Sequence, residues 1–245
     1  MLIATWNLNN RAGCVPFRPE AARAAIALGA DVVVFNEYFP KGEHETFCAS
    51  LRDAGWLHHE MSLDTGVRAN RILIASRMPL EPLEIALPRF DRQFPSNLLG
   101  VRIPSIGVSI LGVRVPWYGG QSASLTISAW DWLETFAADK QCDPWVILGD
   151  MNVGLHSSGS RGGDHFRRIL ASGWQRATPS GTASFLGARS QTSEIDHILG
   201  SPRCEFSNAR YITESGGYVF AGGNGSLSDH AALMADVDLR SQQTM

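Results

Sequence analysis

The chain has 245 residues, of which 44% are hydrophobic and 18% are charged, and its formal net charge is −3. This size and composition are those of a globular protein with a sizeable core, and no apolar run approaches the about eighteen residues that a membrane span needs. The small negative charge argues against a tight, non-specific clamp on nucleic acid, but it allows a local basic groove. Four scattered cysteines without metal-type spacing indicate reduced thiols. No basic and apolar leader opens the chain, so we expect a cytoplasmic protein, and a monomer.

The first quarter of the chain predicts a β-α-β unit followed by a second helix. An apolar strand at residues 2–8 precedes a helix at residues 18–28, which has a proline in its first turn and a glycine after its end. A buried strand follows at residues 31–35. A further helix is expected at residues 43–54, again before a glycine.

The rest of the chain mixes strands in direct succession with strands that helices separate. Strands are predicted at residues 71–76, 84–87, 97–103, 108–115, 145–148, 195–199, 203–212 and 231–237, and helices at 124–139 and 164–172. This mixture favours an α/β (α+β) fold of two packed mixed sheets with helices outside them. We expect one domain over residues 1–239 and a frayed polar tail at residues 240–245.

Short polar motifs lie at the ends of five of these strands. They are Thr5-Trp6-Asn7, Phe35-Asn36-Glu37, Gly149-Asp150-Met151-Asn152, Ile195-Asp196-His197 and Ser228-Asp229-His230. Each motif taken alone is more often an ordinary turn or a core segment. Together they bring acids, amides and an imidazole to sheet edges, and this combination predicts a metal and phosphate site.

The residue types suggest separate roles within that site. Glu37 follows an apolar strand, where a buried acid needs a partner or a metal, so it is the predicted anchor for Mg²⁺. Asp150 is expected to orient or deprotonate an attacking water, and the Asn152 amide to donate to a phosphate oxygen. His230 is expected to act as a general base, or as a cation toward the phosphate, once a buried carboxylate fixes its tautomer. Asp229 is expected to be a further metal ligand or a ligand to a metal-bound water.

Asn7 and His197 also belong to these motifs. Asn7 cannot ionise, but its amide can hold a metal-bound water or orient Glu37. His197 follows Asp196 directly, so its side chain points to the opposite face of the strand, and we interpret it as structural.

In this order, the five motifs resemble those of the endonuclease/exonuclease/phosphatase superfamily, over the span from Ala4 to Val237. The resemblance implies a four-layered α/β sandwich with two central sheets. It also implies a divalent metal, Mg²⁺ or Mn²⁺, and a role for each site residue. In these terms Asn7 and Glu37 surround the metal with Asp229 near it, Asp150 and Asn152 lie at the nucleophile and phosphate, and Asp196 orients His230.

The chain departs from the superfamily pattern at positions that bear on the substrate. Asn36 stands where most members have Gln. Arg114 stands where many members have a His or Tyr that contacts phosphate, so it is a predicted phosphate ligand, with a surface ion pair as the alternative. Trp117 and Tyr118 follow in a glycine-rich loop, where they either stack on a base or cover the core.

The resulting hypothesis is a metal-dependent phosphodiesterase that hydrolyses its substrate by in-line attack of water, most consistent with a nuclease acting on DNA. Arg68, Arg71, Arg89 and Arg92 are candidates for a local basic groove, although such arginines more often form a solvated surface. One alternative is a phosphatase or phosphodiesterase of a small-molecule or lipid phosphate ester with the same centre. Another is a binding protein that kept the fold and lost the reaction.

Overall fold

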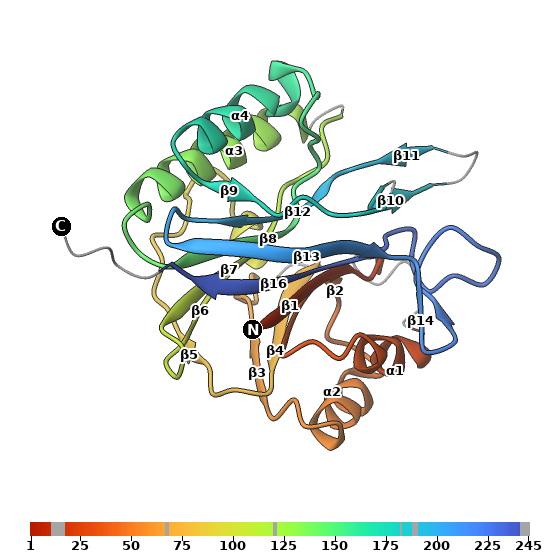
Figure 1. The fold of residues 1–245 in the computed structure, drawn as a ribbon. Helices are drawn as coiled ribbons and strands as arrows, with labels where there is room; N and C mark the ends of the chain where they lie inside the picture. Colours follow the sequence, from red (N-terminus) through yellow and green to blue (C-terminus); the bar gives the residue numbers. More distant parts are fainter. Residues whose placement is uncertain (11–17, 67–68, 120–121, 182, 188–190, 241–245) are drawn as a thin grey trace.

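The protein is a sandwich of two six-stranded sheets, each covered on its outer face by two helices (Figure 1). The computed structural model describes residues 1–10, 18–66, 69–119, 122–181, 183–187 and 191–240. The four layers confirm the predicted fold class. None of the helices described is both long enough and apolar enough to cross a membrane.

The first sheet contains both ends of the described chain. Its strands, in spatial order, are β13 (Cys204–Ile212), β16 (Ala232–Leu239), β1 (Leu2–Asn7), β2 (Val32–Tyr38), β4 (Arg71–Ser76) and β3 (His58–Met61). β1 and β2 are parallel, and the other neighbours are antiparallel. The outer face of this sheet is covered by α1 (Glu20–Ala27), which connects β1 to β2, and by α2 (His44–Asp53).

The second sheet repeats this arrangement around the parallel pair β7 and β8. Its strands, in spatial order, are β5 (Glu81–Pro82), β6 (Leu98–Ile103), β7 (Val108–Arg114), β8 (Trp145–Asp150), β12 (Asp196–Gly200) and β9 (Gln175–Arg176). Its outer face carries α3 (Ala123–Asp139), which connects β7 to β8, and α4 (Gly163–Ala171). The other elements within the described residues are two small hairpins and two 3₁₀ helices: β10 (Phe185–Leu186) with β11 (Thr192–Ser193), β14 (Glu214–Ser215) with β15 (Tyr218–Val219), η2 (Phe94–Asn97) and η4 (Gly159–Arg161).

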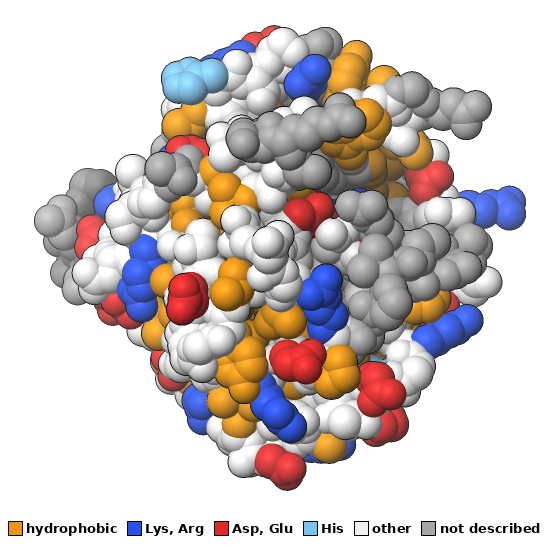
Figure 2. Space-filling view, turned by 90° about the vertical axis from the view of Figure 1, so that its right-hand side faces the viewer, with side chains coloured by type: hydrophobic (Ala, Val, Ile, Leu, Met, Phe, Trp, Pro, Cys, Tyr) orange, Lys and Arg blue, Asp and Glu red, His pale blue; other side chains and the backbone are white. Residues whose placement is uncertain are grey.

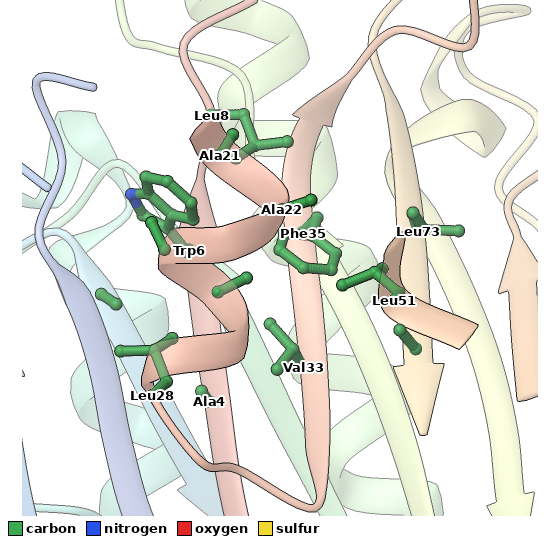
Figure 3. Close-up of a cluster of buried hydrophobic side chains, with 14 of the residues drawn as sticks. Ala4, Trp6, Leu8, Ala21, Ala22, Leu28, Val33, Phe35, Leu51 and Leu73 are labelled. Carbon is green, nitrogen blue, oxygen red and sulfur yellow. The ribbon is translucent and has the colours of Figure 1, made fainter. Parts of the chain in front are cut away.

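Side-chain alternation along the strands produces three separate apolar layers. In β2, Val33 and Phe35 face the helices, whereas Val32 and Val34 face the second sheet. Figure 3 shows Trp6 and Phe35 of the outer layer packed beneath α1. Because both faces of the central strands are buried, the sheets are held at a fixed separation, which matters for any site built from both of them.

The structure differs from the sequence prediction at residues 84–87, which form no strand. β5 lies earlier, at Glu81–Pro82. The apolar alternation that suggested a strand arises because Leu83 and Ile85 pack against the core beneath α3. Trp132 of α3 donates its indole N–H to the carbonyl of Ala86 at 3.0 Å, so side-chain packing takes the place of a strand ladder here.

Element lengths also differ from the prediction in smaller ways. β2 and β8 run further than expected, so Glu37 and Asp150 lie inside their strands. The short strands β3, β9, β10, β11, β14 and β15 were not predicted, because pieces of two to four residues carry too little periodicity. Arg240 still pairs with Glu205, and residues 241–245 lie outside the described residues, so the predicted tail and the domain boundary stay predictions.

The packing of the two sheets generates a first prediction, at Gly112 of β7. A Cβ at this position would lie 2.8 Å from Cγ2 of Ile72 and 3.0 Å from Cγ1 of Val34. We expect Gly112→Ala to lower the free energy of unfolding in urea by about 1–3 kcal/mol, since added volume in a close-packed layer forces its neighbours apart. Gly223→Ala is the matched control, because its Cβ would make an ordinary 3.4 Å contact with Val219 at an exposed position. Equal unfolding midpoints for the two variants would contradict this account of the packing.

Candidate active site

The predicted site residues meet at one edge of the sandwich, where β1, β2, β7 and β8 end and β12 and β16 begin. A cleft of about 1290 Å³ opens there, and its lining includes Glu37, Arg114, Asp150, Asn152, Asp229 and His230. Asn7 and Asp196 are buried and contact the cleft residues from within the protein. Figure 2 shows this end of the molecule, where the described Lys and Arg side chains are scattered among acidic ones.

A β-bulge directs Glu37 into the cleft. The pairing of β2 with β4 shifts register between Phe35 and Tyr38, and Glu37 has a φ of 53°. Phe35 and Tyr38 consequently both face the helix layer, although strict alternation would place them on opposite faces. A non-glycine residue in this left-handed region costs about 1–3 kcal/mol, so the surrounding fold must hold it there.

Glu37 forms an ion pair with Arg114 across the two sheets. Nε and Nη2 of Arg114 donate to the same carboxylate oxygen, Oε1, at 3.0 and 2.7 Å. Both side chains are largely buried. The residue predicted to bind phosphate therefore forms an ion pair with the residue predicted to bind the metal, as in the alternative, although this pair is largely buried at the cleft. The role of Arg114 as a phosphate ligand stays a prediction.

Asp150 is held by hydrogen bonds to both carboxylate oxygens. Asn7 donates its Nδ2–H to Oδ2 at 2.9 Å, and the backbone N–H of Asn152 donates to Oδ1 at 3.1 Å. Gly149 makes this geometry possible, because it has a φ of 146° and a Cβ there would lie 1.9 Å from the carbonyl oxygen of Val113. The strand end can thus turn its acid into the cleft while staying paired with β7.

The charge environment makes Asp150 an unusually basic carboxylate. Burial is the main cause, the Asp196 carboxylate adds to it, and together they raise the pKa of Asp150 to about 7. The cations of His230 and Arg114 oppose this shift, and Glu37 adds to it slightly. Near neutral pH, Asp150 is therefore poised to gain or lose a proton.

Asn152 supports Asp150 and the loop after β7. Its Nδ2 donates to the carbonyl oxygen of Val115 at 2.8 Å and to Oδ2 of Asp150 at 3.2 Å. These two bonds use both amide hydrogens. Donation to a phosphate oxygen, as predicted, therefore requires one of them to be released, and that role stays a prediction.

His230 and Asp196 form a buried pair. Nδ1–H of His230 donates to Oδ2 of Asp196 at 2.8 Å, and Nε2 lies 3.8 Å from Oδ1 of Asp229. The hydroxyl of Ser184 accepts hydrogen bonds from the backbone N–H groups of Ile195 and Asp196, which fixes the start of β12. Burial is the largest single effect and opposes the imidazolium, but the neighbouring carboxylates, chiefly that of Asp196, together outweigh it and raise the pKa of His230 to about 9. The ring is consequently cationic at neutral pH.

Two residues that the motifs contain, but to which the sequence assigned no role, join the first and last motifs. The hydroxyl of Ser228 donates to the carbonyl oxygen of Asn7 at 2.7 Å and accepts from the backbone N–H of His230 at 3.1 Å. Trp6 donates its indole N–H to the carbonyl oxygen of His230 at 2.9 Å. Their position inside polar strand-end motifs was the available signal, but only the three-dimensional structure shows what they contact.

His197 lies on the opposite face of β12 from the cleft, as predicted for a structural residue. Its Nε2–H donates to the carbonyl oxygen of Val153 at 2.6 Å, and its ring packs against Phe166. Nδ1 faces the guanidinium of Arg176 at 3.5 Å and acts as an acceptor. Burial is the main cause that lowers the pKa of His197 to about 4, so the ring is neutral.

The donor chemistry of the cleft fits a hard divalent cation. Carboxylates of Glu37, Asp150 and Asp229 line it, and Oδ1 of Asp196 is buried without a hydrogen-bond partner among the described residues. Among the described residues, no three His, Cys, Asp or Glu side chains lie close enough together to hold a metal ion unaided. Mg²⁺ usually takes one or two carboxylates and completes its shell with water and substrate phosphate, so this arrangement is compatible with it.

The predicted basic groove is not assembled in the described residues. Arg71 is largely buried and lies 3.7 Å from Asp64, over a smaller cavity that Lys41 also lines. Arg89 and Arg92 are exposed on the loop before η2. Arg68 lies outside the described residues. Cations at the cleft come instead from Arg114, Arg161 and Arg176.

Residues 4–230 match the family model described as the Endonuclease/Exonuclease/phosphatase family. The structure is similar to that of an AP endonuclease from Archaeoglobus fulgidus, with 21% identity over 97% of this chain and 99% of that one, at a TM-score of 0.67. It is similar also to the 3'-5' exonuclease NExo from Neisseria meningitidis, with 22% identity, coverage of 97% and 100%, and a TM-score of 0.72. A structure of the 3' phosphatase NExo from Neisseria, bound to a product DNA hairpin, is similar as well. Its identity is 21% over 97% of this chain and 99% of that one, and the TM-score is 0.73. Comparison with curated protein sequences gives no match.

The neutral, buried state of His197 generates a prediction about pH. Its pKa is lowered from 6.5 to about 4 on folding, so its contribution to stability is complete above pH 6.5 and is lost as the pH falls toward 4, because only the unfolded chain then takes up the proton. When the pH is lowered from about 7.5 to about 5, we expect the unfolding free energy of the native protein to fall by about 2 kcal/mol more than that of His197→Gln. The glutamine cannot titrate, but it keeps a hydrogen-bond donor for the carbonyl of Val153. Urea unfolding at both pH values measures this difference. Parallel losses in the two proteins would show that His197 is not buried as the neutral form.

Proposed function

Because this chain belongs to the Endonuclease/Exonuclease/phosphatase family, whose members hydrolyse phosphoric esters, we propose that it is a divalent-metal-dependent phosphodiesterase, and specifically a nuclease that acts on DNA. The observation that supports this proposal is the convergence in one cleft of a basic carboxylate, Asp150, and two cations, His230 and Arg114. This combination suits attack of water on a phosphate: one group takes a proton, and the others stabilise negative charge.

Asp150 is the proposed proton acceptor for the attacking water. A general base works best when its pKa is near the working pH, and the pKa of about 7 meets this condition. Hydrogen bonds from Asn7 and Asn152 keep the carboxylate in one orientation, so little reorganisation is needed during the reaction.

His230 is the proposed cation for the phosphate and its leaving oxygen. Asp196 holds the Nδ1–H, which leaves the Nε2–H side of the imidazolium toward the cleft and Asp229. From there it can stabilise charge on a phosphate oxygen or donate a proton to the departing one. Arg114 supplies a second positive charge to the same cleft and keeps Glu37 in place.

The proposed metal ligands are Glu37, Asp229 and the amide of Asn7, with Mg²⁺ or Mn²⁺ as the ion. When bound, such an ion supplies Lewis-acid stabilisation of charge on the phosphate. Asn7 already supports Asp150 through its Nδ2, so this residue connects the two halves of the proposed centre. Arg114 holds Oε1 of Glu37, so a cation at this carboxylate must share it with the guanidinium.

Nucleic acid, with DNA preferred, is the proposed substrate class. In support, the NExo structure to which this fold is similar is bound to a product DNA hairpin. The alternative, a small-molecule or lipid phosphate ester, is distinguished by comparing rates on nucleic acids with rates on phospholipids and simple phosphodiesters. The cytoplasmic location and the monomeric state expected from the sequence are part of the same proposal.

We expect His230→Ala and Asp150→Asn each to lower the hydrolysis rate at least about 100-fold, because each removes a group that handles a proton or its charge. Rates are measured with Mg²⁺, Mn²⁺ or EDTA on plasmid DNA, abasic duplex, single strands, RNA, phospholipids and simple phosphodiesters. His58→Ala, on β3 outside the cleft, is the control and should keep the native rate. Folded variants with near-native activity would remove the assignment of these residues. Turnover confined to lipid or small esters would exclude a nuclease.

Glu37→Gln tests the metal proposal separately. The substitution keeps the shape of the side chain but removes its charge, so we expect the Mg²⁺ concentration for half-maximal activity to rise at least about tenfold. Direct Mn²⁺ binding, measured by electron paramagnetic resonance, should weaken in parallel. Glu81→Gln, at an exposed acid on β5, is the control. An unchanged metal titration would be incompatible with Glu37 as a ligand.

A further inference from the structure

Trp117 presents a large aromatic surface at the mouth of the cleft. Its side chain is 67% exposed, and it lines the same cleft as Asp150 and Asn152. Burying an indole is strongly favourable, so an exposed one inside a polar cleft calls for an explanation. Packing against the core, which the sequence left open as an alternative, does not account for this position.

The indole rests on the backbone of Gly119. A Cβ at Gly119 would lie 1.9 Å from Cζ3 and 2.2 Å from Cη2 of Trp117, so any side chain there would displace the ring. The six-membered ring is therefore supported on one side by a glycine, while most of its surface stays accessible. The glycine thus lets the ring lie close to the backbone without being covered.

The segment before Trp117 is attached to the proposed catalytic residues. The backbone N–H of Val115 donates to the carbonyl oxygen of Asp150 at 2.9 Å, and the carbonyl oxygen of Val115 accepts from Asn152. The next residue, Pro116, accepts from the hydroxyl of the buried Thr126 of α3 at 3.0 Å. Trp117 lies two residues beyond Val115, so its Cα is at most about 7 Å from that of Val115.

We propose that Trp117 is a stacking platform for an unpaired nucleobase of the substrate, about one nucleotide from the phosphate at Asp150, and that Gly119 positions its ring. This inference rests on the proposed function and specifies the substrate as one with an unstacked base beside the reacting phosphate. A nucleobase matches the flat indole in shape, and stacking on an aromatic side chain tolerates any base. In a regular duplex both faces of an internal base are already stacked, so single strands, ends or disrupted pairs suit this platform.

The test measures binding rather than turnover, in a background of Asp150→Asn with Mg²⁺ present. The probes are a short thymidine strand and a strand of the same length whose nucleosides are replaced by base-free tetrahydrofuran units. We expect Trp117→Ala to weaken binding of the thymidine strand at least about fivefold and to leave binding of the base-free strand unchanged, because only stacking is lost. Gly119→Ala should weaken binding of the thymidine strand to a similar extent, with the tryptophan still present. Trp117→Phe should retain most of the affinity for that strand.

Leu57→Ala is the matched control, since Leu57 is 62% exposed and lies before β3, away from the cleft lining. Equal effects of Trp117→Ala on the two strands, or no effect on either, would overturn the platform. Trp117-dependent binding of sphingomyelin or phosphatidylcholine vesicles without base-dependent strand binding would overturn it in favour of a lipid contact. If the native protein hydrolyses nucleic acid and the Trp117 variants do so equally well, this inference alone is removed. If the native protein shows base-dependent binding but hydrolyses no substrate, the proposed activity alone is removed.

Discussion

Three polar pairs that cross from one sheet to the other hold the cleft together. Asn7 of the first sheet bonds to Asp150 of the second, and Glu37 of the first pairs with Arg114 of the second. His230, just before β16 of the first sheet, pairs with Asp196 of the second. The site is thus the polar rim of the interface between the sheets. Its distances depend on how the apolar layer between them packs, because that layer sets how far apart the strand ends lie.

These crossing pairs also determine where protons reside. Buried acids repel one another, and the two cations at the rim relieve only part of that repulsion. Burial and Asp196 raise the pKa of Asp150, while the same Asp196 raises the pKa of His230. One carboxylate therefore makes its acidic neighbour more basic and its imidazole neighbour more strongly cationic. Asp196 thus contributes to both shifts, alongside burial for Asp150 and the carboxylates of Asp150 and Asp229 for His230.

The sequence was sufficient for the sandwich and for the set of residues that meet in the cleft, because strand-end position is a local property that apolar runs reveal. It was not sufficient for their contacts. The Glu37–Arg114 pair depends on how β2 lies over β7, and no local pattern encodes that relation. The bulge at Glu37 was likewise missed, since one extra residue in a strand leaves almost no trace in composition. The strand expected at residues 84–87 was wrong because alternation there reflects packing beneath Trp132.

The absence of a side chain at Gly112 has a consequence beyond stability. This glycine allows Ile72 and Val34 to approach β7 closely in the layer between the sheets. β7 ends at Arg114 and β2 carries Glu37, so the strands that approach each other at Gly112 are the same strands that carry this ion pair at the rim. Repacking this layer for thermostability would therefore act on the two strands that carry Glu37 and Arg114 to the cleft. In this architecture, a substitution in the layer between the sheets bears on the stability of the fold and on the geometry of the cleft together.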